Sequence, residues 1–233
     1  MNSLHQLFIA GALFLSFTPA CSQKTELPSV FENPIASPAK APKHSAKVDF
    51  YTLKLPSVDA TLSELETLDS RVVKTRNNLK KSRKLVRSVG NGDMKALRKE
   101  IALLIANGTF RVTRKNNLPN LSYNKAKGND RALIVFQSIK ELENTLQTAK
   151  TDFPKMQKDL QRLQKKSKTA IKKAPDEAQK ALSNGKMTPK QLNNTLLKAK
   201  SNLKEVKKVP THVSELSEEI KLTTKLFRNL FKK

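Results

Sequence analysis

The chain has few of the residues from which catalytic centres and cross-linked scaffolds are built. Its 233 residues include one cysteine, six glycines and no tryptophan, and aromatic residues make up only 5%. A single cysteine, Cys21, excludes an intramolecular disulfide and a cysteine-based metal cluster. Six scattered glycines leave little material for a phosphate-binding loop or a nucleophile elbow. The stability of the fold must therefore come from apolar packing.

The titratable residues do not form a recognisable reaction centre either. The three histidines, His5, His44 and His212, show no metal-ligand spacing, so we expect no metal and no cofactor. We read His212 as an ordinary residue near a helix start. Acidic pairs such as Glu215 with Glu218 fall near predicted helix starts, where negative charge is favourable against the helix dipole. We expect no catalytic residues and no enzyme activity.

What the chain does have is positive charge. Lys and Arg number 45 against 20 Asp and Glu, which gives a formal net charge of +25. A charge of this size predicts anionic partners. Lys is much the commoner cation, and it is a strongly hydrated point charge, whereas bidentate reading of phosphates or guanines usually requires Arg. The balance favours diffuse attraction over sequence readout.

The N-terminal residues indicate export. Residues 1–23 contain no Lys, Arg, Asp or Glu, and residues 7–17 form a mostly apolar run. A run of this length is typical of a signal peptide and is too short to span a bilayer comfortably. The run is followed by Thr18, Pro19, Ala20 and Cys21. A small residue directly before a cysteine at this place resembles the lipobox of bacterial lipoprotein precursors.

The resemblance implies that residues 1–20 are a signal peptide and that Cys21 becomes the lipid-modified, palmitate-bearing N-terminus of a cell-envelope protein. Two alternatives stay open, namely cleavage by an ordinary signal peptidase and an uncleaved N-terminal anchor. All three imply export. Residues 21–57 carry repeated prolines among Ser, Ala and Lys, which predicts a disordered linker between the lipid and a folded domain.

Residues 58–233 are predicted to form a basic, all-α domain, an elongated antiparallel helical bundle or coiled-coil hairpin. Apolar periodicity, capping patterns and turn residues predict helices over residues 60–89, 93–106, 130–174, 189–208 and 212–231. Residues 135–174 carry a sustained heptad seam, which predicts one long helix with a kink at Pro154. A short separate helix is expected to start at Pro175. The seam can be satisfied within the chain or by a second copy, so a homo-oligomer is open.

The turn near residue 182 is the expected centre of this hairpin. Pro154 and Pro210 lie equally far from it along the chain, which predicts that both arms bend at one level. Residues 108–130 are polar, and we expect a mobile or functional loop there. Residues 109–114 within it alternate like a strand, but no mate is evident.

The densest positive stretches are the candidate sites for an anionic partner. They include Lys80, Lys81, Arg83, Lys84, Lys165, Lys166, Lys168, Lys172 and Lys173. Such runs are commonly solvated helix faces, but a solvated face works equally well with mixed charge, so the excess of cations indicates an anionic neighbour.

We expect a membrane-anchored module, held by lipid at Cys21, that binds anionic lipid, a cell-wall polymer or an acidic protein. The alternative is sequence-independent nucleic-acid binding, supported by Phe110 beside cations in residues 110–115. A further possibility is that the C-terminal helix, with Phe227 and Phe231, inserts at a membrane surface. We favour packing of that helix in the core.

Overall fold

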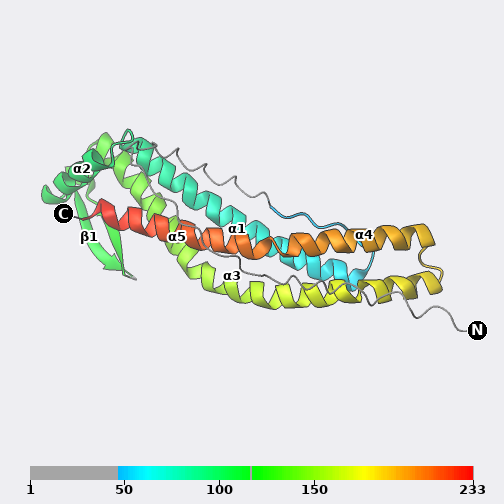
Figure 1. The fold of residues 1–233 in the computed structure, drawn as a ribbon. Coiled ribbons are helices and arrows are strands. Elements are labelled where there is room, and N and C mark those ends of the chain that lie inside the picture. Colours follow the sequence, from blue (N-terminus) through cyan, green and yellow to red (C-terminus); the bar gives the residue numbers. More distant parts are fainter. Residues whose placement is uncertain (1–46, 116, 233) are drawn as a thin grey trace, which may run out of the picture. The chain divides into compact units, whose positions relative to one another are not determined.

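The structure is a computed structural model, and it describes residues 47–115 and 117–232. The predicted signal peptide, Cys21 and most of the predicted linker lie outside the described residues. All described residues belong to one compact unit, His44–Lys233. The unit is mostly helical with one small two-stranded sheet (Figure 1). Its elements are α1 (Pro56–Val89), α2 (Met94–Ala106), β1 (Phe110–Lys115), β2 (Leu118–Tyr123), a 3-10 turn (Lys125–Lys127), α3 (Asp130–Ser183), α4 (Pro189–Val206) and α5 (Val209–Leu230).

The helices α1 and α3 run antiparallel along most of the length of α1. Ser57 at the start of α1 donates a hydrogen bond to Glu177 near the end of α3, and Ser82 near the end of α1 donates one to Thr145. Both helices turn an apolar face toward this contact, because residues at heptad spacing in α1 and α3 are buried. The burial of these two faces against each other is a main source of stability for the unit.

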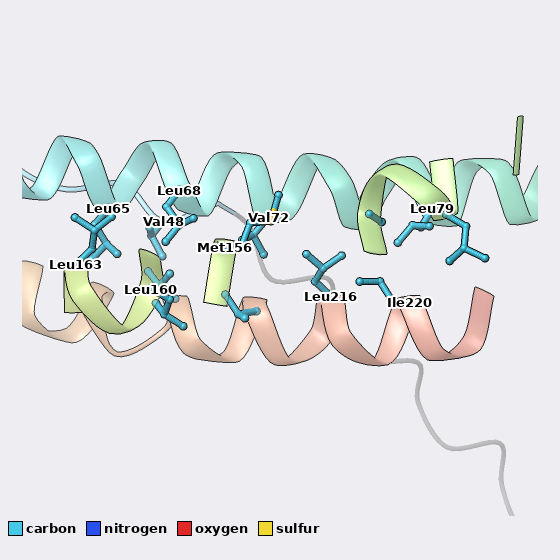
Figure 2. Close-up of a cluster of buried hydrophobic side chains, with 14 of the residues drawn as sticks. Val48, Leu65, Leu68, Val72, Leu79, Met156, Leu160, Leu163, Leu216 and Ile220 are labelled. Atoms are coloured by element: carbon cyan, nitrogen blue, oxygen red, sulfur yellow. The ribbon is translucent and has the colours of Figure 1, made fainter. Parts of the chain in front are cut away.

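The helices α4 and α5 return beside α3 and complete a three-helix bundle. Gly185, at φ +68°, allows the turn after α3, and Thr188 begins α4 with a capping box that includes Gln191. Contacts between α1 and α5 join residues whose numbers rise together, so these two helices run parallel. Figure 2 shows Leu, Val, Ile and Met side chains of α1, α3 and α5 meeting between the helices.

The helix α3 is longer than its sequence predicts. It runs without a break from Asp130 to Ser183, so the predicted end at residue 174 and the separate helix after Pro175 are wrong. Ile171, Ala174 and Ala178 keep the buried face in phase across Pro175. Packing of this continuous face offsets the loss of one backbone hydrogen bond at the proline. Most of the heptad seam is buried within the single chain, by α1, α4 and α5.

The predicted loop over residues 108–130 is a second correction, because most of it is a β-hairpin. Strand β1 pairs antiparallel with β2, with Phe110 opposite Tyr123 and Lys115 opposite Leu118. The missing mate of β1 was overlooked because β2 contains Pro119 and lacks strict alternation. Phe110 packs edge-on against Tyr123 at a centroid distance of 6.1 Å, which ties the hairpin together. The fold is therefore not purely α.

The predicted disordered linker is also wrong over its last residues. Residues 47–55, called the strap from here on, have no regular secondary structure and lie against the bundle. Val48, Leu53 and Leu55 are buried, and Figure 2 shows Val48 among the core side chains of α1 and α3. The apolar periodicity that predicted the helices did not predict that the strap packs on the bundle. The reason is that the strap has no regular secondary structure of its own.

Side chains of the bundle bind the backbone of the strap. The N–H of Val48 donates to Asp69 at 2.9 Å, and the N–H of Tyr51 donates to the side-chain oxygen of Asn202 at 2.8 Å. The side-chain NH₂ of Asn202 donates back to the carbonyl of Tyr51 at 2.8 Å. Asp59 accepts from the N–H groups of Leu53 and Leu55. These bonds take the place of the ladder that a neighbouring strand would supply.

Candidate anionic-ligand site

The nine cations predicted from the sequence lie at two separate levels of the bundle. Lys80, Lys81, Arg83 and Lys84 belong to α1, at the level where Ser82 meets Thr145. The five lysines between residues 165 and 173 belong to α3, at the level where Lys166 meets Glu64 of α1. The two levels are 18 residues apart on α1, or about 27 Å at 1.5 Å per residue. The structure therefore does not join them into one surface.

The cations on α1 are partly used by the fold. Arg83 pairs with Glu219 of α5 at 2.6 Å, and its side chain is only 19% exposed. Lys80 is half-buried, and burial lowers its pKa, with the charge of nearby Arg76 as the next cause. Lys81 and Lys84 are exposed. This group offers only two fully solvent-facing cations to a partner.

The cations on α3 are all available to solvent. Lys165, Lys166, Lys168, Lys172 and Lys173 are exposed. Three of them, Lys165, Lys166 and Lys173, line an open groove of about 620 Å³ between α3 and the start of α1, which we call the basic groove. Its other lining residues are Ser57, Thr61, Arg162, Thr169, Ala170 and Glu177.

Helix geometry explains why these cations share one side of α3. The buried seam of α3 includes Leu163, Ser167 and Ala174. Arg162, Lys166 and Lys173 follow at steps of four and seven residues, so they fall on a single stripe beside that seam. Arg162, Thr61 and Thr169 are not among the predicted site residues, because the prediction rested on runs of charge. Spacing at three, four and seven residues would have found Arg162.

The balance of charge in the basic groove is positive. Four cations face two carboxylates there, Glu64 at its rim and Glu177 in its lining. A hydrogen bond from Lys166, at 2.9 Å, is the main cause that lowers the pKa of Glu64. Among the residues that the structure describes, neither Lys165 nor Lys173 has a carboxylate within ion-pair distance. These two ammonium groups are the ones that a ligand can approach without displacing a protein partner.

Other titratable residues lie inside the bundle, and the interpretation of His212 as an ordinary residue near a helix start was incomplete. His212 is 1% exposed, and its Nδ1 lies 2.6 Å from the carboxylate of Asp69. It is therefore a buried partner of α1, not an ordinary residue at a helix start. Arg76 of α1 pairs with Glu215 of α5 along the same contact between the two helices. The seven-residue spacing of Asp69, Arg76 and Arg83 is the sequence signal that could have revealed this polar seam.

Two aromatic side chains lie in the core, Phe110 against the nucleic-acid alternative and Phe227 in agreement with the favoured packing of the C-terminal helix. Phe110 is 2% exposed, so it cannot stack on a base, and nucleic-acid binding keeps only the charge as its support. Phe227 is fully buried and packs against Phe231 at 5.5 Å, which places the C-terminal helix in the core.

Comparison of the chain with protein-family models, with curated proteins and with solved structures gave no match. Within residues 47–115 and 117–232, no helix has an apolar stretch long enough to cross a membrane. The same part of the chain contains no cluster of His, Cys, Asp and Glu side chains suited to a metal ion. The candidate site therefore has to be interpreted from its own geometry.

Proposed function

We propose that the protein is a lipid-anchored lipoprotein of the bacterial envelope whose bundle is a non-enzymatic binding or structural module for an anionic component. The observation that carries the proposal is the basic groove, where the exposed Lys165 and Lys173 of α3 have no carboxylate partner among the described residues. Lysines held apart without counter-charges repel one another, and an anionic ligand relieves that repulsion. The lipobox-like residues Thr18–Cys21 supply the second half of the proposal, the anchor.

The strap supports a mechanical link between anchor and bundle. Lys47 pairs with Glu66 at 2.7 Å, and Val48 is inserted into the core, so the chain leaves the bundle at a fixed point. The predicted disordered linker between Cys21 and this point supplies the rest of the proposed link. Such a linker would let the groove search the region next to the membrane.

We further propose that α3 with α4 and α5 acts as a coiled-coil hairpin, a stiff arm that presents the groove. Helix α3 has 54 residues, about 80 Å at 1.5 Å per residue. The acyl anchor would hold one end of the protein at the membrane, while the groove binds the anionic component.

The test of the anchor is mass spectrometry of the membrane fraction from the native host. We expect a mature N-terminus at Cys21 that bears acyl chains, and we expect Cys21→Ala to abolish both the modification and membrane retention. An unprocessed chain in the cytoplasm would contradict the proposal and make nucleic acid the leading partner.

A further inference from the structure

We propose that the basic groove binds one strand of a linear, base-free polyanion whose repeats carry phosphate groups, in line along α3. The inference rests on the proposed function, that the bundle binds an anionic envelope component, and names the chemical class of that component. It commits to a polymer strand over a membrane surface, and three properties of the groove support that choice.

The first property is that the cations form a row. Arg162 and Lys173 are 11 residues apart on α3, so the row is about 16 Å long at 1.5 Å per residue. Lys165 and Lys166 lie one turn from Arg162. Arg162, Lys165 and Lys166 fall within about 6 Å along the helix axis, and Lys173 lies about 10 Å further on. Positive charges placed in line in this way suit a ligand whose anionic groups repeat along a chain. Such a row can contact about three phosphates at once.

The second property is concavity. The start of α1 forms one wall of the groove and α3 forms the other, with Thr61 and Ala170 among the lining residues. A planar array of headgroups makes its closest contacts with convex surfaces, whereas this open depression lies between two helices. A single strand can lie in it, and a volume of about 620 Å³ is in the range of ordinary ligand sites.

The third property is the chemistry of the lining. The side chains belong to Lys, Arg, Ser, Thr, Ala and Glu, and none is aromatic. Base stacking on aromatic rings supplies much of the affinity of single-stranded nucleic acids for their proteins. A nucleic acid would therefore gain nothing from its bases here. Ser57 is also unavailable as a donor, because its hydroxyl already donates to Glu177, so recognition must come from the ammonium and guanidinium groups.

The test compares a groove variant with a matched charge variant in the full chain carrying Cys21→Ala. The groove variant is Lys165→Gln with Lys173→Gln, and both side chains are exposed and have no ion pair among the described residues. The control is Lys200→Gln with Lys204→Gln, two exposed residues of α4 that do not line the groove. Far-UV circular dichroism and melting should show all three chains equally folded.

The probe is inorganic polyphosphate about 20 phosphates long, measured by fluorescence anisotropy at several salt concentrations. Each phosphate contact on a single strand contributes about 0.7 to the slope of log K against log salt. Losing two contacts should therefore weaken binding about tenfold at 0.15 M salt and lower the slope by about 1.4. The control variant should weaken binding less than about threefold.

Several outcomes would overturn the inference. Equal losses in both variants would mean diffuse attraction without a groove site. The absence of polyphosphate binding would contradict the inference outright. Binding to anionic phosphatidylglycerol vesicles is measured in the same way. If the groove variant weakens vesicle binding as much as it weakens polyphosphate binding, the site belongs to a membrane surface. A base-containing oligonucleotide of equal charge that binds about tenfold tighter than polyphosphate would assign it to nucleic acid. Failure of acylation at Cys21 would leave the groove result standing, so the two proposals fail separately.

Discussion

Asn202 is expected to be the side chain on which docking of the strap depends most. It is fully buried in α4, and its amide makes two hydrogen bonds of 2.8 Å with the backbone of Tyr51, one as acceptor and one as donor. Replacing it with alanine removes both bonds and leaves a cavity under the strap. The substitution should therefore loosen residues 47–55 before it loosens the bundle.

The expected size of the effect follows from those contacts. Each net hydrogen bond contributes about 1 kcal/mol, and the unfilled volume adds roughly 1 kcal/mol more. The free energy that holds the strap in place should fall by about 2–3 kcal/mol, which corresponds to about a 30- to 150-fold increase in the local opening constant. Asn202→Asp should cost at least as much, because a second oxygen and a buried charge would face the carbonyl of Tyr51.

Amide hydrogen exchange measures this directly. In the parent chain the N–H groups of Val48, Tyr51, Leu53 and Leu55 donate to bundle side chains, so these four should be the slow amides of the strap. Asn202→Ala should accelerate them by the factor above while the middle of α3 keeps its protection. The control is Asn193→Ala, an exposed residue of the same helix, which should change nothing in the strap.

Two results would refute the reasoning. Unchanged exchange in the strap of the Asn202→Ala chain would mean that the amide does not hold it. Equal acceleration in the strap and in α3 would mean that Asn202 supports the bundle as a whole and has no separate role at the strap.

Two further predictions concern the end of the bundle that carries the hairpin. A Cβ on Gly128 would overlap the ring of Tyr123, so Gly128→Ala should cost about 1–3 kcal/mol in urea unfolding. The φ of Gly128 is −98°, so backbone strain does not contribute to this cost. A double-mutant cycle of Gly128→Ala with Tyr123→Ala that shows no coupling energy would contradict the clash. Hydrogen bonds from the N–H groups of Ala96 and then Lys95 lower the pKa of Asp93, the N-cap of α2. The stability that Asp93 contributes is present above the ordinary aspartate pKa and is lost as pH falls through the lowered pKa. Thermal unfolding should therefore show that Asp93→Ala is less stable than the parent chain at pH 7, and that this difference in stability closes below about pH 4. A gap that stays constant on acidification would contradict this assignment.

Local signals in the sequence located most helix ends. The capping box at Thr188 and Gln191 and the Pro189 that follows give the start of α4 at its observed residue. Asp93 accepts hydrogen bonds at the start of α2, within one residue of the predicted start. These features could be predicted because a cap is completed by residues within one turn of one another.

Features that depend on a distant partner could not be read in the same way. Strand β2 forms because β1 and α3 are beside it, and Leu121 donates its N–H to Glu143 of α3. The strap is held against the bundle because Asp69 and Asn202 bind its backbone, and Asn202 lies 151 residues along the chain from Tyr51. Neither segment has a strong local preference of its own.

The candidate site also combines features set by one segment with features set by contacts between segments. The sequence by itself determined that α3 carries exposed lysines, since a heptad seam fixes which side of a helix is buried and leaves the rest to solvent. It also determined the large net positive charge. Only the tertiary structure decided that Lys80 is half-buried and that Arg83 pairs with Glu219 of α5. It also decided that Arg162, Lys165 and Lys173 line a groove whose other wall is α1. The physical reason is that charge and periodicity are properties of one segment, whereas a groove and a buried ion pair exist only where two segments meet.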